Sequence, residues 1–181
     1  MIHALGFQYV GDESPLLRFS VYTELQAQII LKLGEKIDVL VKASFLKEKN
    51  INGKYISQAH GNFWLWILGA FEILRTMADA KSCWSEAKYS EIKKLKIKIS
   101  KIRGPFAKQT LNEKGLPVVN AELSIVIFNT EKCDFGYKIG ETVFLQRELI
   151  EEFRQLIKSF KTEDVIRDHR EKSPPPQTQG W

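Results

Sequence analysis

The stretch from His60 to Met77 constrains the fold most, because HGNFWLWILGAFEILRTM gathers apolar and aromatic residues more densely than any other segment. Drawn as a helix, it has one continuous apolar face made of Phe63, Ile67, Ala70, Leu74 and Met77. Trp64, Trp66 and Phe71 spread apolar surface over much of the remaining circumference. A helix that is apolar nearly all round packs on several sides. The sequence therefore predicts a central helix, whose aromatic group could alternatively line a pocket or contact a second subunit.

This apolar stretch is not expected to cross a membrane. Glu72 and Arg75 interrupt it, and a spanning helix needs about 20 consecutive apolar residues. The first residues, MIHALGFQYV, lack a basic region followed by a long apolar run, so we expect no signal peptide and a cytoplasmic protein. In such a reducing compartment Cys83 and Cys133 are expected to remain thiols.

The composition is that of a folded domain. The chain has 181 residues, of which 44% are hydrophobic and 27% charged, and these values exclude a wholly disordered chain. The formal net charge of +5 permits binding to nucleic acid or to an acidic protein.

Helical periodicity dominates the first half of the chain. A helix is predicted from Thr23, where Thr23 and Gln26 have the spacing of a capping box, to about Lys49. The turn 50–53 leads back into the central helix, predicted from Ser57 to about residues 79–82. Such a short connection makes the two helices antiparallel neighbours.

The segment 86–103 fits two patterns. Leu95, Ile97 and Ile99 alternate with lysines as in a strand, whereas a helix accounts for five apolar positions: Ile92, Leu95, Ile99, Ile102 and Phe106. We predict the helix because it explains more positions. The pair Gly104-Pro105 then ends it.

After a loop at 112–120 the periodicity changes to that of strands, at 123–128, 135–139 and 142–145, with Gly140-Glu141 as a two-residue hairpin turn. A helix follows, with an apolar face made of Leu149, Phe153, Leu156, Ile157 and Phe160. The predicted fold class is α+β: a bundle of three long helices, then a small antiparallel meander and a C-terminal helix. The predicted organisation is an N-terminal arm at 1–22, a helical bundle at 23–111, a meander with a helix packed on the bundle at 112–162, and a flexible proline-rich tail at 163–181.

The lysine-rich helix 86–103 is the predicted binding surface. Lys94, Lys98 and Lys101 lie on one side of its apolar stripe, and Lys93, Lys96 and Arg103 lie on the other. Such a helix could neutralise several phosphates. The alternative is a solvated face that keeps the protein soluble, and few aromatic residues are interleaved for base stacking.

The end of this helix, Arg103-Gly-Pro-Phe-Ala-Lys108, resembles the motif of HEPN-domain proteins. These are helical bundles, many of them RNA-cleaving toxins or defence nucleases, and their motif is an arginine followed after four to six residues by a histidine. Here Lys108 stands where the histidine should be, and Gly104 replaces a commonly polar residue. The resemblance covers only the helical half, from about Thr23 to Leu111. It implies that Arg103 and Lys108 bind a phosphate, because a protonated lysine cannot exchange a proton near neutral pH.

No other motif indicates catalysis. His60 and Glu72 are too far apart for a helical metal pair, and no nucleotide-binding, zinc-protease or serine-hydrolase motif is present, so we expect neither a metal nor a cofactor. We therefore expect a noncatalytic module that binds RNA or an acidic protein through Lys94, Lys98, Lys101, Arg103 and Lys108, and we expect it to form a homodimer. The alternatives are a divergent HEPN-like ribonuclease and a structural subunit of a larger complex.

Overall fold

The computed structural model describes residues 14–45, 50–105, 125–139 and 141–169. The helices are α1 (Pro15–Phe19), α2 (Val21–Ser44), α3 (Gly53–Asp79), α4 (Glu86–Arg103) and α5 (Gln146–Lys158), with short 3-10 turns η2 (Lys81–Cys83) and η4 (Thr162–Asp164). The strands are β1 (Ile125–Asn129), β2 (Asp134–Ile139) and β3 (Thr142–Leu145). The predicted α+β fold class, three long helices followed by an antiparallel meander and a helix, is confirmed.

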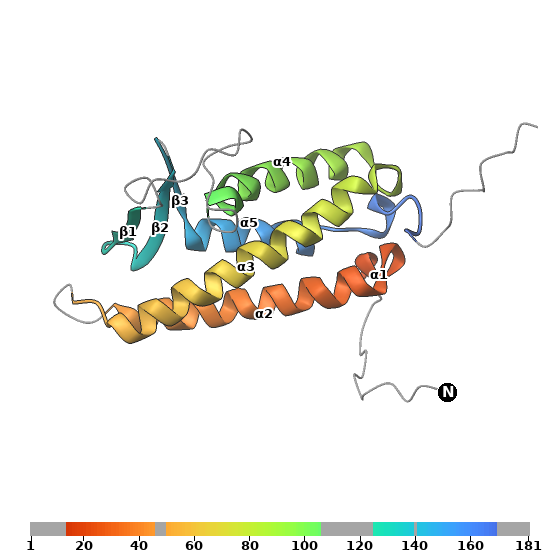
Figure 1. Ribbon diagram of the computed structural model, residues 1–181. Coiled ribbons are helices and arrows are strands. Elements are labelled where there is room, and N and C mark those ends of the chain that lie inside the picture. The colour runs from red at the N-terminus through yellow and green to blue at the C-terminus, as the bar shows by residue number, and fades with distance from the viewer. Residues whose placement is uncertain (1–13, 46–49, 106–124, 140, 170–181) are drawn as a thin grey trace, which may run out of the picture.

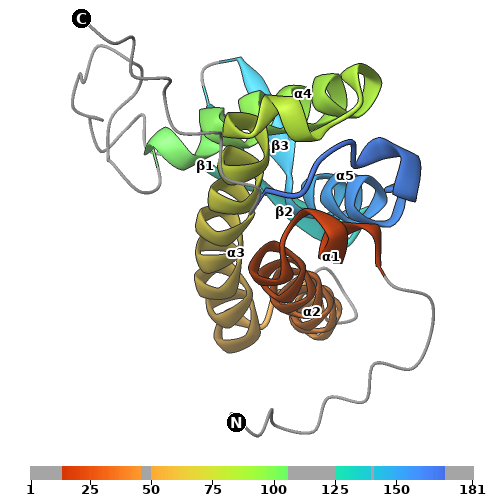
Figure 2. The same cartoon turned by 90° about the vertical axis from the view of Figure 1, so that its right-hand side faces the viewer.

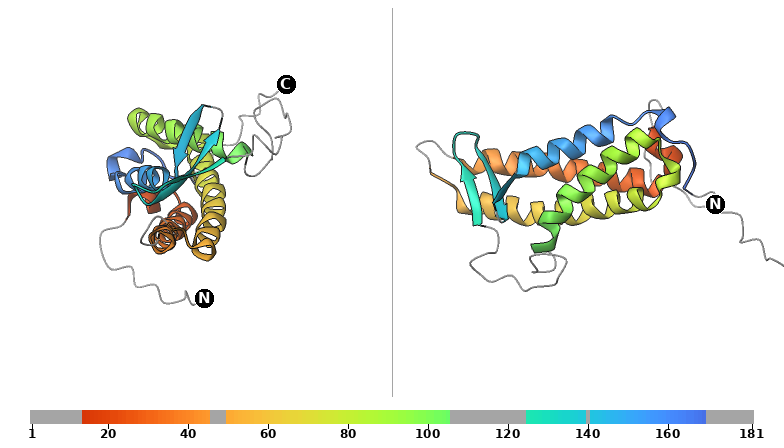
Figure 3. Two further views of the ribbon diagram at one scale, coloured as in Figure 1. Left: turned by 90° about the vertical axis from the view of Figure 1, so that its left-hand side faces the viewer. Right: turned by 90° about the horizontal axis from the view of Figure 1, so that it is seen from above.

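The long helices form a bundle with the sheet at one end. Helices α2 and α3 run antiparallel along each other, while α4 and α5 cover the other side of α3 and α2 (Figures 1 and 2). The sheet has the order β1-β2-β3, with Val126 opposite Tyr137 and Tyr137 opposite Phe144. Seen from above, it stands where α5 begins and α2 ends (Figure 3). The final helix therefore links the sheet to the bundle.

An aromatic core joins α3 to the sheet and to α5. Phe63 stacks on Trp66 and on Tyr137, with ring centroids 5.7 and 5.8 Å apart. Trp66 meets Phe153 of α5 edge-on at 5.6 Å. All four side chains are fully buried. Trp64, by contrast, is 39% exposed, so the helix, predicted to pack on several sides, is not covered at Trp64. The cause is that α3 lies at the edge of the bundle and has one open side.

Helix α2 begins one turn earlier than predicted. Ser20 is its N-cap, and the Ser20 hydroxyl accepts a hydrogen bond from the Thr23 amide at 3.4 Å. Thr23 is buried inside the first turn, so the predicted capping box at Thr23 does not form. The predicted N-terminal arm is also wrong for its last residues, because α1 buries Leu16 and Phe19 in the core. Residues 1–13 lie outside the described residues.

Three further predicted boundaries differ. Helix α2 ends at Ser44, with 46–49 outside the described residues, and α3 begins at Gly53, where the Asn52 side chain accepts from the amides of Lys54 and Tyr55. Asn52 thus caps the helix in place of the predicted Ser57. The predicted tail at 163–181 begins too early, because Val165 is buried and pairs with Trp84 in a β-bridge. Position 140 of the predicted hairpin turn lies outside the described residues, although Ile139 pairs with Thr142 across it.

Candidate nucleic-acid interface

Helix α4 forms as its apolar spacing predicts. The Ser85 hydroxyl caps its first turn by accepting from the Lys88 amide at 3.3 Å. Its core-facing side is made of Ile92, Leu95, Ile99 and Ile102, all buried, whereas Phe106 of the predicted stripe lies outside the described residues. Burial of this stripe fixes the rotation of the helix. The side chains opposite it must therefore point to solvent.

Four residues lie on the solvent side of α4, and we call them the outer α4 face: Lys93, Lys94, Ile97 and Lys101. All four are exposed, Ile97 by 49%. Within the part of the chain that the structure describes, no carboxylate lies within 4.0 Å of Lys93, Lys94 or Lys101. These ammonium groups are available to an anionic ligand.

Lys98 turns away from this face. Its ammonium forms an ion pair and a hydrogen bond with Glu152 of α5. The two residues lie in a groove of about 480 Å³ between the helices, whose lining also includes Glu91, Lys94, Leu95, Gln155, Leu156 and Ser159. Because carboxylates stand in both walls, the groove is not a cationic channel. Lys98 is therefore a poor phosphate ligand while it is paired with Glu152.

Arg103, the last residue of α4, turns toward α3. Its guanidinium lies 4.2 Å from the centre of the Phe71 ring, and one nitrogen is 3.5 Å from a Glu72 oxygen. The Nε atom is buried and has no hydrogen-bond acceptor among the described residues. The guanidinium thus serves mainly to pack α4 on α3. Lys108, its predicted companion, lies outside the described residues.

The five predicted site residues are therefore not one surface. The structure brings Lys94 and Lys101 together on the outer α4 face, and it places Lys98 and Arg103 on opposite flanks. Lys93, which the sequence assigned to the other side, belongs with Lys94 and Lys101 because it stands at the boundary between the two sides.

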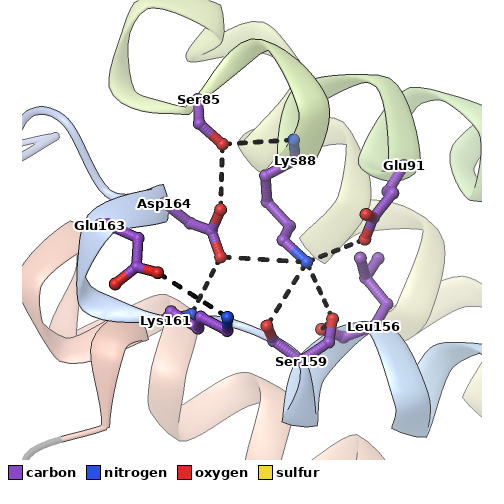
Figure 4. Close-up of polar contacts among 8 residues, drawn as sticks. All are labelled: Ser85, Lys88, Glu91, Leu156, Ser159, Lys161, Glu163 and Asp164. Carbon is purple, nitrogen blue, oxygen red and sulfur yellow. Dashed lines mark hydrogen bonds and ion pairs between the residues drawn. The ribbon is translucent and has the colours of Figure 1, made fainter.

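At the N-terminal end of α4, Lys88 is buried among polar groups of α4, α5 and η4, and the sequence did not predict this contact (Figure 4). The Lys88 ammonium donates to Glu91 Oε2 at 2.8 Å and to Ser159 Oγ at 2.9 Å, and lies 4.0 Å from Asp164 Oδ2. Only 6% of the Lys88 side chain is exposed, and its ammonium stands over the Phe160 ring at 5.1 Å. The sequence does not predict the burial of Lys88, because the local pattern does not distinguish Lys88 from the exposed lysines of the same segment.

A second polar contact links α3 to the sheet. The Tyr137 hydroxyl lies 2.6 Å from His60 Nδ1, so His60 joins α3 to β2. Burial lowers the pKa of His60 and raises the pKa of Tyr137. Both shifts favour the neutral forms. The pair is therefore an uncharged hydrogen bond near neutral pH.

A third polar group lies where α2, β2 and α5 meet. Burial raises the pKa of Asp134, and the hydrogen bond from the Phe135 amide at 2.8 Å opposes this shift. The Asp38 carboxylate of α2 accepts hydrogen bonds from the Gln146 side chain at 3.3 Å and from Arg154 at 3.5 Å. In its alternative amide orientation the Gln146 nitrogen donates to Asp134 instead, also at 3.3 Å. This group fixes the start of α5 against the bundle.

Across the described ranges, no three His, Cys, Asp or Glu side chains are grouped so that they could hold a metal ion. None of the helices in the described residues combines the length and apolar character needed to cross a membrane.

Compared with known proteins, the chain matches no family model, no curated protein and no solved structure.

Proposed function

We propose that this chain is a noncatalytic binding module that binds RNA through the outer α4 face. The observation that carries the proposal is the exposure of Lys93, Lys94 and Lys101 on one helix, with no described carboxylate within 4.0 Å of their ammonium groups. Phosphates neutralised by such lysines release condensed counterions, which favours binding at low salt. An acidic protein is the other ligand that such a face would accept.

The test is a fluorescence anisotropy titration of the full chain with RNA over a series of salt concentrations. The variant Lys93→Gln/Lys94→Gln/Lys101→Gln should bind at least about tenfold more weakly, because three phosphate contacts are lost. The matched control is Lys32→Gln/Lys36→Gln/Lys42→Gln, which removes the same charge from exposed positions of α2. Equal weakening by the two variants, or no binding at low salt, would refute the proposal.

A ribonuclease of the HEPN type is the alternative activity. Arg103 ends α4, which is where the resembling motif places its arginine, and this position supports the alternative. Against it, the guanidinium is engaged by Phe71 and Glu72. A nuclease of this kind would cleave RNA and lose the cleavage in Arg103→Ala. The proposed module leaves RNA intact and should bind it with unchanged affinity in that variant, provided that the variant remains folded by circular dichroism.

Self-association of the binding module, which the sequence analysis also expects, is favoured by an apolar stripe on α2. Tyr22, Leu25 and Ile29 are exposed at helical spacing, Tyr22 by 79% and Ile29 by 63%. Ile29 also borders a hollow of about 150 Å³ between α2 and α3. A stripe of this kind can pack on its copy around a twofold axis. We propose a homodimer through it, which light scattering would detect and which Ile29→Glu should convert to a monomer.

We propose that this protein is cytoplasmic, as the sequence predicts. Both cysteines are thiols in the structure, Cys83 buried and Cys133 exposed.

A further inference from the structure

The shape of the outer α4 face bears on which form of RNA it would accept. Lys94 and Lys101 are two helical turns apart, about 10.5 Å along the axis at 1.5 Å per residue. Each strand of B-form DNA presents roughly one phosphate per 3.4 Å of its axis, and the rise of an A-form RNA duplex is shorter, so a straight row of this length spans at least about three phosphates of one strand. The face is convex because it is the outside of a helix whose opposite side is packed on the core.

A single strand is usually held differently, in a cationic groove with aromatic side chains on which its bases stack. The groove alongside α4 carries Glu91 and Glu152, whose charges oppose a phosphate chain. Lys98, which also lines that groove, is already paired with Glu152. Lys94 is thus the one lysine of the groove lining without a described ion pair, and it stands beside these two carboxylates, so the groove does not offer a single strand a continuous cationic path.

Base-stacking platforms are also missing from this face. Of the described aromatic residues, Tyr89 is the one that belongs to α4, and it is half-buried beneath the Lys81 ammonium at 5.5 Å. The apolar member of the outer α4 face is Ile97, which offers no π surface. Base recognition by stacking has no support here, whereas contact with a regular phosphate backbone requires none.

Building on the proposed function, we infer that the outer α4 face binds double-stranded RNA through its backbone and discriminates against single strands. The recognised feature is the fixed spacing of phosphates along a rigid duplex. Binding is consequently insensitive to base sequence.

The experiment compares an RNA hairpin with an unstructured single strand of the same length, using anisotropy with the full chain over a salt series. The hairpin should bind at least about tenfold more tightly, with a slope of log K against log salt of about −2.7, the value for three neutralised phosphates. The triple lysine variant of the outer α4 face should flatten this slope, and the α2 control variant should keep it. A second hairpin of unrelated sequence should bind within about twofold of the first.

The possible failures are distinguishable. Equal or tighter binding of the single strand, still reduced by the triple lysine variant, would overturn the duplex inference and leave the proposed function standing. A strong preference for one hairpin sequence would also overturn the inference. Binding of neither RNA at low salt would overturn the proposed function itself.

Discussion

Lys88 and Ser159, 71 positions apart in the chain, are joined by a hydrogen bond of 2.9 Å from the buried ammonium to the hydroxyl. This contact ties the first turns of α4 to the end of α5. Beside it, the Ser85 amide donates to the Asp164 carbonyl and the Ile166 amide donates to the Cys83 carbonyl, each at 2.9 Å. The segment after α5 is thereby fixed to the connection between α3 and α4, and this holds the basic helix in its place.

Replacing Lys88 by methionine should destabilise the protein by about 1–2 kcal/mol, because its buried acceptors lose a charged donor while the apolar stem is kept. Chemical unfolding measures the change, and hydrogen exchange should speed up at the amides of Ser85 and Ile166. The control Lys93→Met removes an exposed lysine from the same helix and should change stability by less than about 0.5 kcal/mol. Similar effects from the two variants would show that the Lys88 contacts do not stabilise this end of the bundle.

Replacing Glu152 by glutamine should strengthen RNA binding. The change releases Lys98 from its ion pair and removes a negative charge from the edge of the basic helix. We expect about threefold tighter binding at low salt and a slope against log salt that is steeper by about 0.9. The control is Glu148→Gln, which removes an α5 carboxylate that faces Lys132 instead of α4. Anisotropy titration measures both, and an equal gain in the control would count against a specific role of Lys98.

Stability should fall as the solution is acidified below about pH 6.5, in part because of His60. Burial lowers the pKa of His60, so the unfolded chain binds this proton more tightly than the folded chain does. Protonation then favours unfolding, and the contribution is absent at pH values where the imidazole is neutral in both states. Urea unfolding at about pH 7.5 and about pH 5.5 should show a larger loss for the native chain than for His60→Gln. Equal losses would exclude His60 as a source of this pH dependence.

Two glycine-to-alanine substitutions should have opposite effects on the stability of the protein. A Cβ atom at Gly136 would lie 2.4 Å from the backbone oxygen of Phe144 and 3.1 Å from the Cα of Leu145, so β2 and β3 would have to separate. We expect Gly136→Ala to destabilise the protein by about 3 kcal/mol. At Gly61, inside α3, a Cβ atom meets nothing within 4 Å, and Gly61→Ala should stabilise by about 0.8 kcal/mol. Thermal unfolding of the two variants checks both signs, and stabilisation by Gly136→Ala would contradict the strand packing.

The sequence predicted an element best where the spacing of apolar residues within that element determines its structure. The buried side of α4 followed from Ile92, Leu95, Ile99 and Ile102, because a period near 3.6 residues brings them to one face. Helix starts were less predictable. Ser20 and Thr23 can both cap a helix, and the choice of Ser20 depends on burying Thr23 beneath the neighbouring elements.

By itself, the sequence determined the α+β class, the buried apolar face of the aromatic helix and the excess of lysine on α4, since composition and periodicity act within a segment. Only the tertiary structure decided which cations remain available. Glu72 of α3 pairs with Arg103, and Glu152 of α5 pairs with Lys98. Lys94 and Lys101 stay exposed. The physical reason is that the energy of an ion pair depends on the distance between the two charges in space, which is set by the helices that pack together and not by distance along the chain.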